Sequence, residues 1–170
     1  DSEWWLYPFN RREPGANDCA CKTKDEIVAK LEQLLYKNRY KIVLLATHHP
    51  FQANGSHGGY HSLKEHIFPL TAVNKDLYIP LPVVGSLYPL LRNAFPSTED
   101  LRHPLYKSFI RSIYAVTKSY PNIIRVSGHE HGLQLIRDNG IQVVSGAASK
   151  STPLKVKDTF ALKTQGYVIA

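Results

Sequence analysis

Two short apolar runs constrain the fold of this chain more than any other feature. The segment KIVLLAT at 41–47 is continuous, apolar and β-branched, and NIIRVSG at 122–128 has the same character. Such runs are typical of strands buried on both faces of a sheet. We therefore expect two strands of one sheet, with helical and irregular segments between them, which favours an α/β fold.

Two longer helices are predicted around these strands. Thr23 and Glu26 have the spacing of a capping box, and apolar residues at helical period follow to about Asn38. Pro104 suits the first turn of a second helix, which ends before Tyr120 and its following proline. Because 43% of the 170 residues are hydrophobic, residues 1–170 can form a single domain with a core of its own.

Shorter elements complete the expected layout. The segment 48–104 is rich in Pro and Gly and only partly regular, and loops of this length are usually functional. The remaining predictions are a strand at EWWLY (3–7), short helices at SLKEH (62–66) and SLYPLLRNAF (86–95), a hairpin at 133–146 with DNG as its turn, and a last strand at GYVIA (166–170).

Histidines follow both apolar runs. His48 and His49 stand at the carboxyl end of the first, and His129 and His131 follow the second. On an extended segment, side chains two residues apart share a face, so His129 and His131 are expected to converge. Histidine is the commonest metal ligand, and functional loops gather at the carboxyl ends of strands. A metal site built from both strand ends is favoured. In the alternative, one histidine of the first pair caps its strand and the other is exposed.

The motifs THHPF (47–51) and GHEH (128–131) resemble the C-terminal motifs of calcineurin-like metallophosphoesterases, and GSHGGYHSLKEHIFPL with LPVVGSLYPLLR looks like a bacterial branch of them. The resemblance implies half of an αββα sandwich, with a mixed sheet, flanking helices and a long irregular insertion. It also implies hydrolysis of a phosphomonoester or phosphodiester at two divalent ions, with Mn, Fe, Zn and Ni not distinguished. By this resemblance His48 and His129 bind the second ion and His131 binds the first, while His49 falls on a variable position.

Three further motifs of that family are absent: Asp-x-His, Gly-Asp-x-x-Asp and Gly-Asn-His-Asp/Glu. They supply the bridging carboxylate, an Asn ligand and the histidine thought to protonate the leaving group. The resemblance therefore implies the C-terminal portion of a hydrolase, with a missing N-terminal half as its partner and with little or no activity alone. The sheet face left uncovered is expected to be buried by self-association or by rearranged packing. The competing hypothesis is a non-catalytic interaction module with a structural or vestigial metal site.

Other residues near these motifs have more ordinary interpretations. His57 and His61, in the glycine-rich NGSHGGYH, are candidates for contact with the substrate, although plain loop histidines are the alternative. Glu130 is expected to point away from the metal and into solvent by strand alternation. His66 and His103 flank predicted helices and are expected to be structural.

The net charge of +7 favours an anionic partner such as a phosphorylated substrate. No Lys/Arg block is longer than RR at 11–12, and neither zinc-finger spacing nor an RNA-recognition signature is present, so nucleic-acid binding is not indicated. The longest purely apolar run, IVLLA at 42–46, is too short to cross a membrane.

Overall fold

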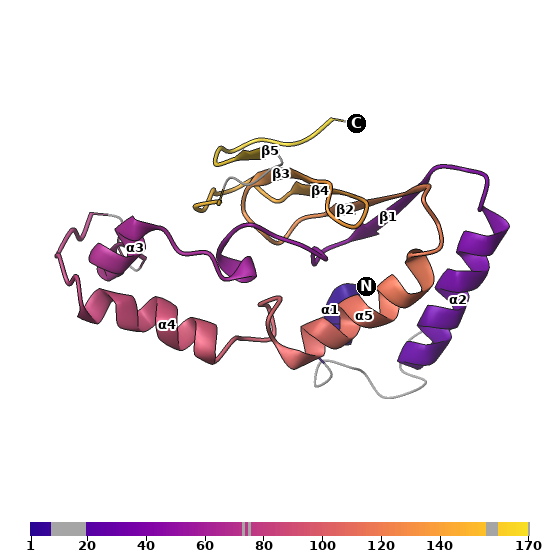
Figure 1. The fold of residues 1–170 in the computed structure, drawn as a ribbon, viewed down its shortest axis with the longest axis horizontal. Coiled ribbons are helices and arrows are strands. Elements are labelled where there is room, and N and C mark those ends of the chain that lie inside the picture. The colour runs from indigo at the N-terminus through magenta and orange to yellow at the C-terminus, as the bar shows by residue number, and fades with distance from the viewer. Residues whose placement is uncertain (8–19, 73, 75, 156–159, 170) are drawn as a thin grey trace.

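The structure, a computed structural model, describes residues 1–7, 20–72, 74, 76–155 and 160–169. A five-stranded mixed sheet has the order β1-β2-β4-β3-β5, with α1, α2 and α5 on one side of it (Figure 1). The predicted α/β class is confirmed. The helices are α1 (Ser2–Leu6), α2 (Lys24–Lys37), α3 (Leu63–Ile67), α4 (Leu87–Ala94) and α5 (Pro104–Thr117), and the strands are β1 (Val43–Thr47), β2 (Ile123–Ser127), β3 (Leu133–Ile136), β4 (Ile141–Ser145) and β5 (Phe160–Leu162).

The sheet combines parallel and antiparallel pairs. β1 pairs in parallel with β2 in a register that ends with Thr47 opposite Ser127, and β2 pairs in parallel with β4. β3 pairs antiparallel with both β4 and β5. Between β3 and β4, Asn139 and Gly140 have φ of 53° and 105°, the left-handed conformation that Asn-Gly adopts in tight hairpins. The hairpin predicted from DNG is confirmed.

Both long helices begin at the predicted signals. The Thr23 hydroxyl accepts the Glu26 N–H while the Glu26 carboxylate accepts the Thr23 N–H, which closes the capping box before α2. Pro104 is the first residue of α5, and Nδ1 of His103 accepts an N–H of the first turn at 3.3 Å. This contact gives His103 the structural role expected for it. The short helices predicted in the long segment are present as α3 and α4, with 3₁₀ turns at η2 (Ser56–Gly58), η3 (Pro69–Ala72) and η4 (Val84–Ser86).

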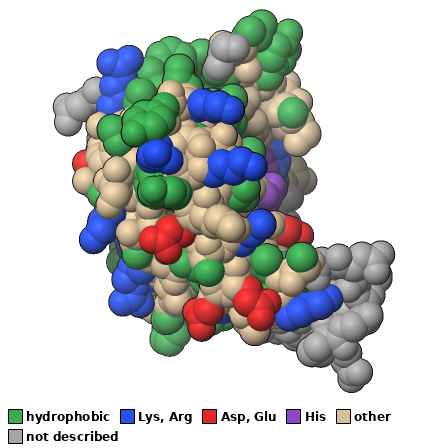
Figure 2. All heavy atoms as spheres, turned by 90° about the vertical axis from the view of Figure 1, so that its right-hand side faces the viewer, with side chains coloured by type: hydrophobic (Ala, Val, Ile, Leu, Met, Phe, Trp, Pro, Cys, Tyr) green, Lys and Arg blue, Asp and Glu red, His purple; other side chains and the backbone are tan. Residues whose placement is uncertain are grey.

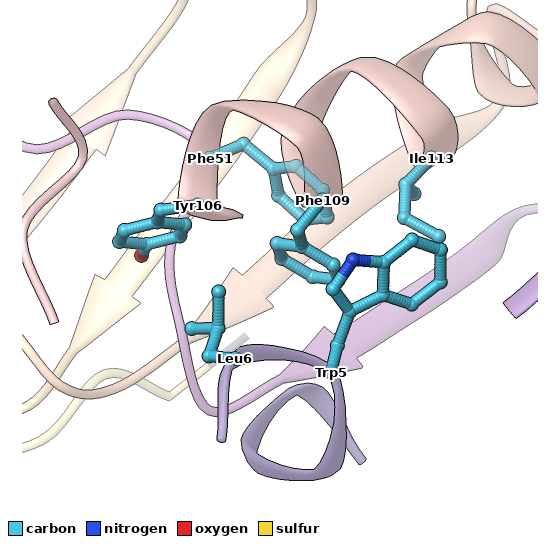
Figure 3. Packing of buried hydrophobic residues seen from close by; sticks show 6 residues of the cluster. All are labelled: Trp5, Leu6, Phe51, Tyr106, Phe109 and Ile113. Carbon is cyan, nitrogen blue, oxygen red and sulfur yellow. The ribbon is translucent and has the colours of Figure 1, made fainter. Parts of the chain in front are cut away.

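The strand predicted at 3–7 is wrong, because these residues form α1. The Asp1 side chain accepts the Glu3 N–H at 2.9 Å and caps this helix. Trp5 and Leu6 are 3% and 0% exposed and point toward α5 (Figure 3). A run of five residues is too short for its periodicity to separate a strand from a helix. Burial against α5 decides the conformation.

The core lies between α1, α5 and one face of the sheet. Phe109 of α5 packs edge-on against Trp5, with ring centroids 5.6 Å apart, and stacks on Phe51 at 5.5 Å (Figure 3). Tyr106 is fully buried beside them, and its hydroxyl donates to the Pro50 carbonyl at 2.7 Å. This contact ties α5 to the chain that leaves β1, so the core and the end of β1 are packed as one unit.

Strand β1 is half-buried on one face and exposed on the other, contrary to the prediction. It is the edge strand, with Leu45 packed against the core and Leu44, on the opposite face, 63% exposed. Neighbouring strands place further apolar residues on the same face as Leu44, and three of them are also exposed: Ile141, Phe160 and Leu162. Within the described part of the chain, this sheet face is apolar and partly open to solvent.

The last strand was predicted at 166–170, but the strand at this end of the chain is β5, Phe160–Leu162. Residues 166–169 form no strand, and Ala170 lies outside the described residues. Their N–H groups have other acceptors, because Gly166 donates to the Ala147 carbonyl and Val168 donates to the Ser145 hydroxyl. An apolar run at the end of a chain therefore did not identify its strand.

Positive charges are scattered on the side formed by α2 and the start of β1. Figure 2 shows Lys and Arg side chains lying among hydrophobic ones on this side. The Arg39 guanidinium lies 4.5 Å and 4.6 Å from the ring centroids of Tyr36 and Tyr40. As for membranes, none of the helices in the described residues is long and apolar enough to span one.

Replacing Phe109 tests the core. The Phe109→Ala variant should lower the free energy of unfolding by about 3–5 kcal/mol, because it removes a buried ring that contacts Trp5 and Phe51. Phe95→Ala is the matched control, since Phe95 is 78% exposed and its loss should change stability by about 0.5 kcal/mol or less. Urea denaturation measures both. Equal losses in the two variants would contradict this placement of the core.

Candidate metal centre

The pairing of β1 with β2 brings two histidine-bearing strand ends together. Thr47 lies opposite Ser127, and just beyond this pair the Gly128 N–H donates to the His48 carbonyl at 3.1 Å. Because the strands are parallel, both carboxyl ends lie at the same edge of the sheet. His48 and His129, 81 positions apart in sequence, are therefore neighbours in space.

The imidazoles of His48 and His129 approach each other edge-on, with ring planes at 75°. Nε2 of His48 lies 3.3 Å from Nδ1 of His129, and Nε2 of His129 lies 2.9 Å from the Glu99 carbonyl oxygen. A carbonyl only accepts, so Nε2 of His129 carries a hydrogen and Nδ1 offers its lone pair toward His48. Two nitrogens bound at about 2.0–2.1 Å to a tetrahedral ion lie about 3.3 Å apart, so this pair is spaced for one ion. The Glu99 carbonyl fixes the ring orientation, as outer partners of metal-binding histidines do.

A third histidine, His49, belongs to the same group. One ligating atom from each of His48, His49 and His129 lies within 4.8 Å of the others. His49 is 1% exposed, its Nδ1 lies 2.9 Å from the Ser2 hydroxyl oxygen, and its ring packs edge-on against Tyr106. Sequence reasoning excludes His49 because it falls on a variable motif position. In the sequence, the position of His49 next to His48 is the feature that could have identified it as part of the site.

Two of these imidazoles are neutral at pH 7. Burial, followed by repulsion from His129 and His48, lowers the pKa of His49 to about 3. Burial, followed by repulsion from His57, lowers the pKa of His129 to about 4. The neutral imidazole is the form that binds a metal ion. The crowding of the rings thus keeps them in the form that can act as ligands.

His131 does not join this group of three. The extended backbone predicted for residues 129–131 is wrong, because His129 has φ of 61° and the segment is bent. Burial, followed by the charges of Lys150, His57 and His48, lowers the pKa of His131. Its role as a ligand of a separate ion stays a prediction.

Of the two loop histidines, His57 reaches the cluster and His61 lies beside a neighbouring ion pair. The ring centroids of His57 and His129 are 4.1 Å apart. Nδ1 of His57 lies 3.2 Å from Oδ1 of Asp100, which also accepts from Arg92 at 3.0 Å. Burial lowers the pKa of His61, and its charged neighbours include Arg92 and Asp100. Substrate contact by either histidine stays a prediction.

Glu130 is buried, contrary to the expectation that it faces solvent. It is 0% exposed, and its carboxylate accepts the His57 N–H at 3.1 Å. Strand alternation fails here because the left-handed backbone of His129 turns the chain just before Glu130. Glu130 therefore points into the protein, beneath the loop that carries His57.

A hollow of about 430 Å³ opens beside His48. It lies at the carboxyl ends of β1, β2 and β4, and its remaining lining residues are Asp1, Ser2, Ala46, Thr47, Val126, Ser127, Gly128 and Ser145. Ligand sites in open α/β sheets occupy this position. The hollow leaves space for a small ligand next to one of the candidate metal-binding rings.

The donor set fits one divalent ion but lacks an anion to bridge two. Within the described residues, the group that could hold an ion consists of imidazoles alone, which suit Zn, Fe, Cu and Ni. Asp100 is already engaged: burial alone would raise its pKa, but hydrogen bonds from His57 and Arg92 hold that pKa well below its usual range. Glu130 is engaged with the loop backbone.

Comparison with family models, with curated proteins and with solved structures finds no match for the chain. The contacts of the residues themselves therefore decide what the site can do. They provide two imidazole nitrogens spaced for one ion, a third imidazole beside them and a hollow that is open to a ligand.

The left-handed backbone of His129 gives a stability prediction. Both His129→Gly and His129→Ala remove the imidazole, but only glycine adopts φ of 61° without strain. We expect His129→Gly to be the more stable of the two by about 1 kcal/mol, measured by urea denaturation. At Ala29, which lies on the exposed side of α2, the change Ala29→Gly should have the opposite sign. If His129→Gly were less stable than His129→Ala, the left-handed conformation of residue 129 would be contradicted.

The lowered pKa values predict a loss of stability in mild acid. The imidazoles of an unfolded chain titrate near 6.5, above the folded values of about 3 for His49 and about 4 for His129. Below pH 6.5 the unfolded chain therefore binds more protons, and the free energy of unfolding should fall as pH decreases toward 4. For the fully buried His49 the loss at pH 5 is about 2 kcal/mol. Denaturation in chelator at pH 7.5, 6 and 5 measures it, and a flat profile would contradict it.

Proposed function

We propose that this chain carries the histidine ligands of a metal-dependent phosphoesterase that hydrolyses a phosphomonoester or phosphodiester. The observation that carries the proposal is the 3.3 Å approach of His48 Nε2 to His129 Nδ1 across two parallel strand ends. It rests also on the motifs THHPF and GHEH, which contain these two histidines. Within the proposal His48 and His129 hold one divalent ion, and His131 contributes to a second.

The surroundings of this pair support hydrolysis of a phosphate ester. A bound divalent ion would polarise a phosphoryl oxygen as a Lewis acid. The hollow beside His48 gives the phosphate group a place to bind. His57 pairs with Asp100 through Nδ1, and its ring centroid lies 4.1 Å from that of His129, so this imidazole could hold or give up a proton beside the proposed ion. The chain's charge of +7 favours an anionic substrate.

The proposal includes a carboxylate-bearing partner, because the candidate metal centre, within the part of the chain that the structure describes, consists of imidazoles without a bridging anion. In the αββα sandwich that the resemblance implies, a second sheet packs against the first. The exposed apolar face that contains Leu44, Ile141, Phe160 and Leu162 is the surface on which such a sheet would pack. Without that partner, the same face is open to a second copy of the chain, since monomers rarely leave large apolar patches exposed.

Metal binding tests the site itself. After chelator treatment, Zn²⁺ or Co²⁺ should bind at about one ion per chain, and His48→Ala and His129→Ala should each weaken binding about tenfold or more. His131→Ala should change the affinity for this ion only slightly, because His131 lies outside the group of three. Calorimetry and the visible spectrum of Co²⁺ give the two readouts.

His66→Ala is the matched control for metal binding, since His66 lies in α3 and pairs with the Ser86 hydroxyl at 3.2 Å. Its affinity should equal that of the unaltered chain. Absence of binding, or equal weakening by His66→Ala, would refute the metal centre. Binding without any phosphoesterase activity of the complete gene product would favour the interaction module with a structural ion.

The chain alone should show little or no turnover of p-nitrophenyl phosphate or its bis-ester with added Mn²⁺, Zn²⁺ or Ni²⁺. Two ions held close together repel without an anion between them, and the family's Asn-His motif is absent, so general-acid help worth about 10²–10⁴-fold is missing. The product of the complete gene should hydrolyse at least one of these esters, and His129→Ala should abolish that activity. Equal turnover by the chain alone would show that it needs no partner.

A further inference from the structure

The segment that carries His57 is held in place by buried side chains of the sheet instead of by strand pairing. Oε1 of Gln142 accepts the N–H groups of Phe51 at 3.0 Å and Gln52 at 3.2 Å, and Oε1 of Gln134 accepts the Asn54 N–H at 2.9 Å. Gln142 and Gln134 are 0% and 1% exposed. Since both belong to paired strands, they fix the first part of the segment firmly to the sheet.

Glu130 holds the next part of this segment. One carboxylate oxygen accepts the His57 N–H at 3.1 Å, and the Thr152 hydroxyl lies 3.4 Å from the other oxygen and 3.3 Å from the His131 carbonyl oxygen. The Gly58 N–H donates to the Gly55 carbonyl at 3.0 Å and is also directed toward the Glu130 carboxylate. Burial raises the pKa of the Glu130 carboxyl, whereas these donors act to lower it. In its ionised form the carboxylate can accept all of these bonds, and such charge-assisted bonds are strong. Glu130 thus receives donors from two separate loops.

Gly55 shows how closely the loop lies on this carboxylate. A Cβ atom at position 55 would lie 2.3 Å from both the carboxyl carbon and one oxygen of Glu130. No side chain fits there unless the carboxylate moves. The backbone at 55 is extended, so alanine would be strained by this contact and not by its own conformation.

Two anchors therefore fix His57 relative to the histidine cluster. Glu130 binds its backbone, and Asp100 binds Nδ1 of its ring at 3.2 Å. Asp100 is itself held by Arg92 and by the Ser97 N–H, both at 3.0 Å. The ring of His57 is thereby placed 4.1 Å from that of His129, measured between centroids.

We propose that Glu130 is a positioning residue that sets His57 against the ion held by His48 and His129. Glu130, which stands between the two histidines of GHEH, is outside the group of candidate ligands and is 0% exposed. Its carboxylate makes the loop and the metal-bearing turn a single unit, so that His57 and the ion act on the same phosphate group. This inference rests on the proposed function for its catalytic part, and on the hydrogen bonds alone for its structural part.

The Glu130→Gln variant tests the structural part. Its amide keeps one acceptor oxygen but loses the negative charge, so the bond from the His57 N–H weakens even where that oxygen still accepts it, and exchange of the His57 amide hydrogen should accelerate about tenfold. The ¹⁵N signals of the His57 ring at pH 7.5, which report its pairing with Asp100, should change, while the Co²⁺ spectrum should not. Gly55→Ala should reproduce these effects with Glu130 intact. Glu32→Gln, on the exposed side of α2, is the matched control and should have none of them.

Activity of the complete gene product tests the catalytic part. Glu130→Gln should lower kcat about tenfold or more while KM changes little, because the ion remains bound while His57 is no longer held in position. Unchanged amide exchange in Glu130→Gln would overturn the proposal. If that variant does not fold, unchanged exchange in a folded Gly55→Ala would overturn it equally. An inactive gene product would refute the phosphoesterase function, while the exchange data still decide whether Glu130 positions the loop.

Discussion

The parallel pairing of β1 with β2 is the contact on which the candidate site depends. Each strand end supplies one histidine of the candidate metal-binding pair, and the register that places Thr47 opposite Ser127 makes the two ends level. A slip of one residue would turn the side chains of β1 to the other face and separate His48 from His129. The pairing is maintained by the core beneath it, where Leu45 packs against the aromatic cluster of α1 and α5. A loss of core packing would therefore also disturb the geometry of the candidate site.

The site gathers groups that are unfavourable when considered singly. His129 has a left-handed backbone, and His49 is an imidazole buried to 1% exposure. Glu130 is a carboxylate without exposure to water. Each of these has a compensating contact: the Glu99 carbonyl for His129, the Ser2 hydroxyl for His49 and loop N–H groups for Glu130. Such strain persists where surrounding structure fixes it and is concentrated at functional sites.

Elements with a local signal could be predicted from the sequence, and those decided by packing could not. A capping box, Pro104 and the Asn139–Gly140 turn act within a few residues, so α2, α5 and the hairpin follow from the sequence. The helix at α1, the edge position of β1 and the strand at β5 depend on partners far away in the chain. For the site, the proximity of His48 to His129 could be predicted, because each follows an apolar run that forms a strand, and the ends of parallel strands lie at one edge of the sheet. The burial of Glu130 does not, because strand alternation fails at the turn of His129.

Two features of the described residues lie at the same edge of the sheet: a group of imidazoles and an uncovered apolar face. Within the described residues, the candidate ligands are imidazoles alone, with the Glu3 carboxylate 4.0 Å from Nε2 of His49, and the face beyond Leu44 lacks a covering layer. The hollow beside His48 joins them, since Ala46 and Val126, which line it, belong to that same apolar face. A body packed on the face would therefore reach the hollow and could place acidic groups next to His48 without moving β1 or β2. Under the proposed function, one partner packed on this face would therefore supply both the covering layer and the bridging carboxylate.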